Sequence, residues 1–176
     1  MTTIPNLLGV HALVWVGGWS KDQCREAIKN SAEAGYGLIE IPALDPKSID
    51  VEHTKATLKE FGLKGACSLG LSFDADINND DSEIAKRGEA RLMDALNVVE
   101  QLGGDYLGGV IFSALGKYKF PPTKKARDNA VAALKRLAIA AQANFPADIR
   151  DSVAKVLLDL WKCFVAEDAT LVEINP

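Results

Sequence analysis

The sequence predicts an α/β protein with one parallel sheet, and three observations support this prediction. Short apolar runs of strand length alternate four times with longer stretches whose apolar residues have helical spacing. Each strand-helix unit is roughly 30 residues long, which suits a right-handed crossover between parallel strands. Glycines such as Gly35 and Gly62 stand where helices end, as left-handed C-cap residues do. An open doubly wound sheet and a half barrel both fit this pattern.

The element boundaries follow from apolar runs, capping residues and turn residues. Ser20-Lys21-Asp22-Gln23 has the form of a capping box and opens the first helix. Pro42 and Pro46 mark a loop before the second helix. We expect strands at residues 7–15, 38–41, 64–71 and 106–112, followed by helices at about 20–35, 50–61, 82–102 and 123–141.

Composition limits the class of protein. The chain has 176 residues, enough for one ordinary domain and fewer than the roughly 250 of a complete eight-unit barrel. Its hydrophobic fraction is 48% and its net charge is -4, so we expect a sizeable core and no nucleic-acid partner. Neither a secretory signal nor a membrane-length apolar run is present in the sequence, which leads us to expect a cytoplasmic protein with no membrane partner.

The three cysteines are odd in number and widely spaced. Cys24, Cys67 and Cys163 include no C-x-x-C pair, so neither a disulfide framework nor a zinc site is indicated. Each is expected to be a small core residue. No glycine-rich phosphate-binding pattern follows any expected strand, which removes the usual nucleotide-binding variants of α/β proteins.

Few residues stand out as candidates for chemistry. Glu40 lies near the end of a strand, where α/β proteins place groups that face a ligand, although a carboxylate there can equally pair with a loop lysine. Residues 74–81 form an acidic loop that lacks the glycine and terminal glutamate of an EF-hand, so we expect a solvated loop before a helix. Taken alone, His11 is a hydrogen-bonded core histidine and Trp19 a core or lid aromatic.

Several short segments together resemble a known family. Their order and spacing, over about residues 7–142, are similar to the N-terminal half of the ketose 3-epimerases, the D-tagatose and D-psicose (allulose) 3-epimerases of the xylose-isomerase-like barrel superfamily. The segments are Leu8-Gly9-Val10-His11 with Trp19, Ala34-Gly35-Tyr36 through Glu40-Ile41, Gly62-Leu63 with Cys67-Ser68-Leu69-Gly70, and Leu102-Gly103-Gly104 with Gly108-Gly109.

The resemblance implies half of a TIM barrel and part of a sugar site. The family binds a divalent metal, manganese or magnesium, and moves a proton at C3 of a ketohexose with two glutamates. First-half residues shape the sugar pocket, and Trp19 agrees with an aromatic that the family usually carries there. His11 and Leu115 stand where members commonly carry aromatics. The expected substrate-binding residues are therefore six: His11, Trp19, Glu40, Ser68, Val110 and Leu115.

The family's metal ligands and catalytic glutamates lie on strands five to eight. In this sequence, Thr170-Leu171-Val172-Glu173-Ile174-Asn175 is the candidate for a fifth strand. We therefore assign Glu173 as the candidate catalytic residue and Glu173 with Asn175 as candidate metal ligands. One carboxylate cannot hold a catalytic metal that needs several convergent ligands. The chain is accordingly expected to lack the complete metal and catalytic site.

The tail, residues 143–176, has a second resemblance. The string from Glu167 to Pro176, Glu-Asp-Ala-Thr-Leu-Val-Glu-Ile-Asn-Pro, is similar to a segment of the ATP-grasp domain of succinyl-CoA synthetase β subunits, where Asn175 would bind magnesium beside a nucleotide. Two resemblances meeting near residue 142 predict a chimera or truncated fusion. We expect a half-barrel segment, 1–142, with an appended helix and fifth strand, 143–176, packed on the same sheet. Its exposed sheet edge predicts a homo-oligomer.

Three functional hypotheses follow. The first is an epimerase-related half barrel that is weakly active or inactive. The second is an active metal-dependent sugar isomerase or epimerase in which a homodimer closes the barrel. The third is a nucleotide-binding fragment related to the synthetase tail, or an engineered chimeric scaffold without activity. Metal-dependent sugar binding separates the first two, and stabilisation by nucleotide would favour the third.

Overall fold

The computed structural model describes residues 7–141. The chain divides into two compact units, each assembled from two stretches of sequence. The described part of the first unit contains residues 7–70 and 90–111, and that of the second contains residues 71–89 and 112–141. No helix within these described residues is long and apolar enough to cross a membrane.

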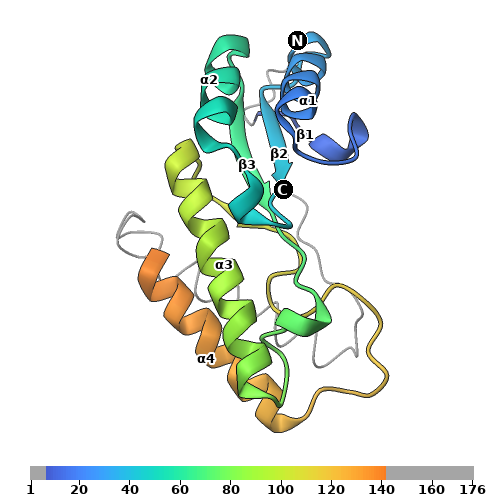
Figure 1. Cartoon of the computed structure of the whole chain (residues 1–176), viewed down its shortest axis with the longest axis vertical. Helices are drawn as coiled ribbons and strands as arrows, with labels where there is room; N and C mark the ends of the chain where they lie inside the picture. The colour runs from blue at the N-terminus through green and yellow to red at the C-terminus, as the bar shows by residue number, and fades with distance from the viewer. Residues whose placement is uncertain (1–6, 142–176) are drawn as a thin grey trace. The chain divides into compact units, whose positions relative to one another are not determined.

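The first unit is built on one parallel sheet. Its strands are β1 (Gly9–His11), β2 (Leu38–Pro42), β3 (Lys64–Ser68) and β4 (Leu107–Gly108), hydrogen-bonded in the order β1-β2-β3-β4. Figure 1 labels β1, β2 and β3. All three neighbouring pairs are parallel, and the strand order follows the sequence. This confirms the predicted α/β fold with four parallel strands in one open sheet.

Helices α1 and α2 connect the first three strands of this unit. Helix α1 (Lys21–Glu33) begins with the predicted capping box, in which the side chains of Ser20 and Gln23 each accept a hydrogen bond from the other residue's backbone N–H. Helix α2 (Val51–Phe61) ends at Gly62, whose φ of 71° is the left-handed C-cap conformation. Arg25 of α1 and Glu60 of α2 form a two-point ion pair at 2.6 and 2.7 Å, which joins the exposed sides of the helices.

One face of the sheet carries the core of the first unit. Ile39 and Ile41 of β2 are fully buried, as is Ile28 of α1. Successive strand residues point to opposite faces, so the residue between the two isoleucines, Glu40, points to the other face. Cys24 and Cys67 are buried thiols, as the sequence predicted.

The remaining helices are α3 (Ser82–Leu102), which contributes to both units, and α4 (Lys124–Ala141) of the second unit. Asp81 accepts a hydrogen bond from the Glu83 backbone at 2.8 Å, so a carboxylate stands at the start of α3 as predicted. In the second unit, Arg136 of α4 pairs with Glu89 of α3 through two contacts of 2.6 and 2.7 Å.

The first and fourth strands are shorter than predicted. The run from Leu7 to Trp15 is extended only through β1 and then turns into a 3-10 helix, Ala12–Val14, because the His11 side chain accepts a hydrogen bond from the Leu13 amide. Strand β4 stops at Gly108 because Gly109 has a φ of +94°, outside the extended region. The third strand also ends early, at Ser68 instead of Leu71.

The expected solvated loop at residues 74–81 is a second correction. Residues 75–78 are buried, and Asp76 is fully buried. Its carboxylate accepts hydrogen bonds from the Tyr118 hydroxyl at 2.5 Å, the Asn78 amide at 2.8 Å and the Ala114 amide at 3.1 Å. These donors replace the water that a charged loop would otherwise need. Asp76 thus ties the loop after β3 to residues 114–118 within the second unit.

Candidate functional site

Polar side chains occupy the sheet face opposite the core of the first unit. His11, the last residue of β1, pairs in register with Glu40 of β2, which pairs with Ala66 of β3. Ser68 lies two residues beyond Ala66 and pairs with Gly108 of β4. Since residues two apart on a strand share a face, His11, Glu40 and Ser68 all belong to this face. Tyr106, which precedes β4, reaches the same face because its hydroxyl contacts Glu40. We call these four residues the polar face.

Direct contacts join the polar face. His11 Nε2 lies 3.1 Å from Ser68 Oγ and 3.6 Å from Glu40 Oε1. The other oxygen of Glu40, Oε2, accepts a hydrogen bond from the Tyr106 hydroxyl at 3.3 Å. The side chains of His11 and Glu40 are 34% and 28% exposed, so both remain accessible to a ligand.

The contacts of His11 fix its tautomer. The Leu13 backbone N–H donates to His11 Nδ1 at 3.1 Å, so Nδ1 must be unprotonated. In the neutral imidazole the proton is therefore on Nε2, which donates to Ser68 Oγ. The serine hydroxyl can then donate its own proton to another acceptor. Because His11 Nε2 already carries a proton, it cannot serve as the base that would activate Ser68 as a nucleophile.

Glu40 also affects two neighbouring groups. Burial and then the Glu40 charge raise the pKa of the Cys67 thiol to about 12. Burial, and after it the Glu40 charge, also raises the pKa of the Tyr106 hydroxyl. At neutral pH the Tyr106 hydroxyl therefore keeps its proton and donates a hydrogen bond to Glu40. The polar face consequently offers fixed donors and acceptors rather than a reactive thiol or nucleophile.

Three of the six expected substrate-binding residues meet on this face: His11, Glu40 and Ser68. Val110 is half-buried and follows β4 by two residues, after Gly109. Leu115 belongs to the second unit, is 62% exposed, and donates its backbone N–H to Leu71 O at 2.7 Å. The candidate catalytic and metal-binding residues, Glu173 and Asn175, lie outside the described residues.

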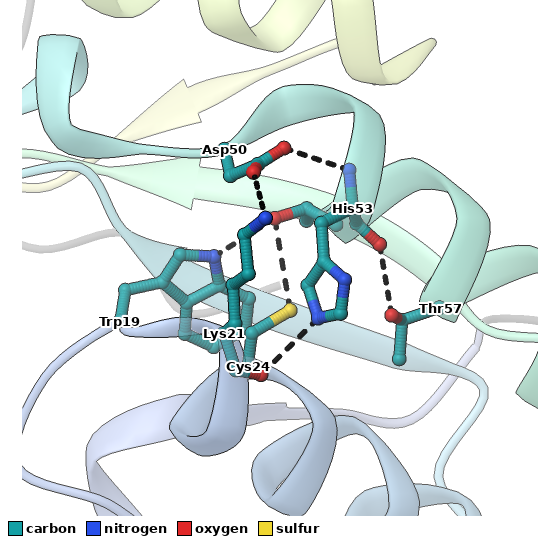
Figure 2. A network of polar contacts seen from close by, with 7 residues as sticks. Trp19, Lys21, Cys24, Asp50, His53 and Thr57 are labelled. Atoms are coloured by element: carbon teal, nitrogen blue, oxygen red, sulfur yellow. Dashed lines mark hydrogen bonds and ion pairs between the residues drawn. The ribbon is translucent and has the colours of Figure 1, made fainter.

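Trp19 takes part in a different network. Its indole N–H donates to Thr54 Oγ1 of α2 at 3.1 Å, and Cys24 Sγ lies 3.6 Å from the same oxygen (Figure 2). Close by, Lys21 pairs with Asp50 at 2.9 Å, and His53 Nε2 lies 3.2 Å from the Lys21 carbonyl. This network joins the N-terminal ends of α1 and α2. The indole N–H of Trp19 is thus hydrogen-bonded to α2 as part of this network.

Sequence reasoning missed Tyr106 as a site residue. It identified Tyr106 only as the start of a strand, although the alternation of strand residues places it on the same face as Gly108. The pairing of Tyr106 with Glu40 joins residues 66 positions apart and has no sequence signature.

No family model matches the chain. Over 130 residues it is 48% identical to the L-ribulose 3-epimerase of Methylomonas sp. strain DH-1, a match that covers 74% of this chain and 46% of the relative. Over 131 residues it is 40% identical to the ketose 3-epimerase of Arthrobacter globiformis, covering 74% of this chain and 45% of that protein. The chain spans about half the length of the curated relatives it matches.

Solved structures give the same result. The crystal structure of a D-allulose 3-epimerase from Methylomonas sp. in complex with D-allulose matches with a TM-score of 0.75 and 47% identity, over 78% of this chain and 48% of that one. A structure of an L-ribulose 3-epimerase matches with a TM-score of 0.73 and 30% identity, over 78% and 46% of the two chains. Over about three quarters of its length, the chain is thus similar in sequence and fold to the ketose 3-epimerases, and its open four-stranded sheet matches half of such a barrel.

Proposed function

We propose that the polar face binds the hydroxyl groups of a ketose, and that this chain is an epimerase-related half barrel. The observation that supports the proposal is the contact between His11, Glu40 and Ser68, which come from three adjacent parallel strands. Similarity to ketose 3-epimerases supports the choice of a sugar, as does the complex of one matching structure with D-allulose.

The donors and acceptors on this face suit a sugar hydroxyl, which both donates and accepts. The Ser68 hydroxyl oxygen accepts a hydrogen bond from His11 Nε2, so the hydroxyl proton of Ser68 is free for a hydrogen bond to the sugar. Glu40 accepts from Tyr106 through one oxygen, and its carboxylate has further lone pairs for a sugar hydroxyl. A polar group that is matched to a ligand hydroxyl discriminates strongly against ligands that lack it.

The residues of this face do not fit a divalent metal. Within residues 7–141, no group of three or more His, Cys, Asp or Glu side chains could hold a metal ion. The polar face contains a single carboxylate, whereas magnesium and similar cations take several oxygen ligands. We therefore assign His11 and Glu40 to sugar binding. Glu173 and Asn175 remain our proposed candidates for catalysis and metal binding, and any activity depends on residues outside the polar face.

The outer strands of the sheet support a proposal of self-association. In the described part of the first unit, β1 and β4 are the outer strands, and Leu7 and Leu8 beside β1 are 55% and 56% exposed. An exposed apolar strand edge favours pairing with another chain. Light scattering of the full chain tests this proposal, and a monomer at all concentrations up to the solubility limit would contradict it.

Sugar binding can be measured directly on the full chain by titration calorimetry with D-allulose and L-ribulose. We expect saturable binding, and Glu40→Gln is expected to weaken it on the order of tenfold, because the substitution removes the charge and replaces one acceptor oxygen by an NH2 group that can only donate. Glu52→Gln is the matched control, since Glu52 is an exposed carboxylate in the first turn of α2. Absence of saturable binding to the wild type would contradict the proposed function.

A further inference from the structure

Tyr106 lies against the strand that it precedes. A Cβ atom added to Gly108 would lie 2.9 Å from Tyr106 Cε2 and 3.2 Å from the Tyr106 hydroxyl oxygen. Gly108 is not among the glycines with positive φ in the described residues, so its backbone conformation is open to other residues. The lack of a side chain at Gly108 therefore provides space for the Tyr106 ring.

A second contact holds the same, hydroxyl-bearing end of the ring. The Tyr106 hydroxyl donates to Glu40 Oε2 at 3.3 Å, across the sheet from β4. With its edge against Gly108 and its hydroxyl at Glu40, the ring has a defined position on the polar face. Tyr106 is nevertheless 45% exposed. Ring surface directed away from the strand is therefore open to solvent, beside the hydroxyl-binding groups.

We propose that Tyr106 is the aromatic platform on which the sugar stacks. This inference rests on the proposed function. A sugar presents C–H groups between its hydroxyls. The face of an aromatic ring is apolar and carries partial negative charge, so it attracts such C–H groups. Tyr106 supplies an aromatic surface from the end of the same sheet face, next to Glu40 and its hydroxyl-binding oxygens.

The platform makes Gly108 a positioning residue. Gly108→Ala would force the Tyr106 ring away from the strand without removing it. In sugar titrations of the full chain, we expect Tyr106→Ala to weaken D-allulose binding on the order of tenfold, and Tyr106→Phe to stay within roughly threefold of the wild type. Gly108→Ala should weaken binding about as much as Tyr106→Ala. In the Tyr106→Ala background, Gly108→Ala should have no further effect, because there is no ring to displace.

Tyr36→Ala is the matched control, because Tyr36 is a half-buried tyrosine that precedes β2 and is not part of the polar face. Circular dichroism and urea unfolding of every variant separate lost folding from lost binding, and Tyr106→Phe tests the ring with its volume kept. If the wild type binds D-allulose and Tyr106→Ala binds equally well, the platform is overturned and the proposed function stands. Additive losses for Gly108→Ala and Tyr106→Ala would also overturn it. If the wild type binds no sugar, both proposals fall.

Discussion

Asp76→Ala is expected to destabilise the second unit strongly. Asp76 is fully buried, and its carboxylate accepts three hydrogen bonds, from the Tyr118 hydroxyl and the amides of Asn78 and Ala114. Truncation leaves the Asn78 amide and the Tyr118 hydroxyl without this acceptor. The Ala114 amide retains a second acceptor, the Tyr118 oxygen at 2.9 Å.

The magnitude follows from the two donors that lose their partner. A buried donor left unsatisfied costs about 1–3 kcal/mol, so the two together predict a loss of about 3 kcal/mol in the free energy of unfolding. That is a large part of the 5–15 kcal/mol that is typical of a domain. Asp76→Asn keeps an oxygen for both backbone amides and should cost less than Asp76→Ala. Only the donor contact of Tyr118 is then lost.

The direction in which stability changes with pH provides a second test of the role of Asp76. Burial raises the pKa of Asp76 above its ordinary value of 3.8, against the opposing effect of its three hydrogen bonds. The folded state therefore holds the proton to a higher pH than the unfolded state. The stabilising contribution that protonated Asp76 makes to the free energy of unfolding is complete below pH 3.8 and is lost as pH rises through the folded-state pKa. The stability of the wild type relative to Asp76→Asn should accordingly fall as pH rises above 3.8.

Urea unfolding by far-ultraviolet circular dichroism measures the global effect, and hydrogen exchange of the Asn78 amide reports the local one. We expect a lower urea midpoint for Asp76→Ala and faster exchange at Asn78. An unchanged midpoint together with unchanged exchange would refute the role of Asp76 as the link between the two loops. A relative stability that rises with pH would refute the reasoning about its pKa.

Three further predictions concern residues outside the polar face. Cys24 and Cys67 should resist iodoacetamide at pH 8 in the folded chain, because burial raises the pKa of both thiols, that of Cys67 to about 12, and peptide mapping that finds either one alkylated would contradict this. Gly88→Ala should destabilise by about 1–3 kcal/mol, because the added Cβ would lie 2.4 Å from the Ala75 carbonyl oxygen; a gain, as in an exposed helix, would contradict it. Ser20→Ala should cost about 1 kcal/mol in urea unfolding through loss of the capping box, and an unchanged midpoint would show that this cap is dispensable.

The sequence predicted the parallel sheet and all four α-helices of the described residues because their signals are local. Apolar runs, the capping box at Ser20 and the glycine after Phe61 each report on their own neighbourhood. Strand ends were harder to predict, since the end of β1 depends on a side-chain cap by His11 and the end of β4 on the φ of Gly109. Composition alone does not reveal either feature.

The candidate site was predicted in part for the same reason. Glu40 was recognisable as a carboxylate within an apolar strand. The alternative interpretation was a pairing with a loop lysine, whereas the structure shows contacts of Glu40 with His11 and Tyr106. The platform residue Tyr106 depends on strand register and on the empty space at Gly108, which only the folded sheet provides. The burial of Asp76 likewise depends on a tyrosine 42 residues away.

The central claim, that a ketose binds on the polar face, can be tested most directly by following the two histidine side chains of the chain by NMR. His11 lies on the polar face, and His53 lies in the network between α1 and α2, so His53 is an internal control in the same sample. The account predicts that D-allulose shifts the His11 ring signals in a saturable way and leaves His53 unchanged. It also predicts that the proton of the neutral His11 ring is on Nε2. Equal shifts at both histidines, or none at saturating sugar, would contradict the account.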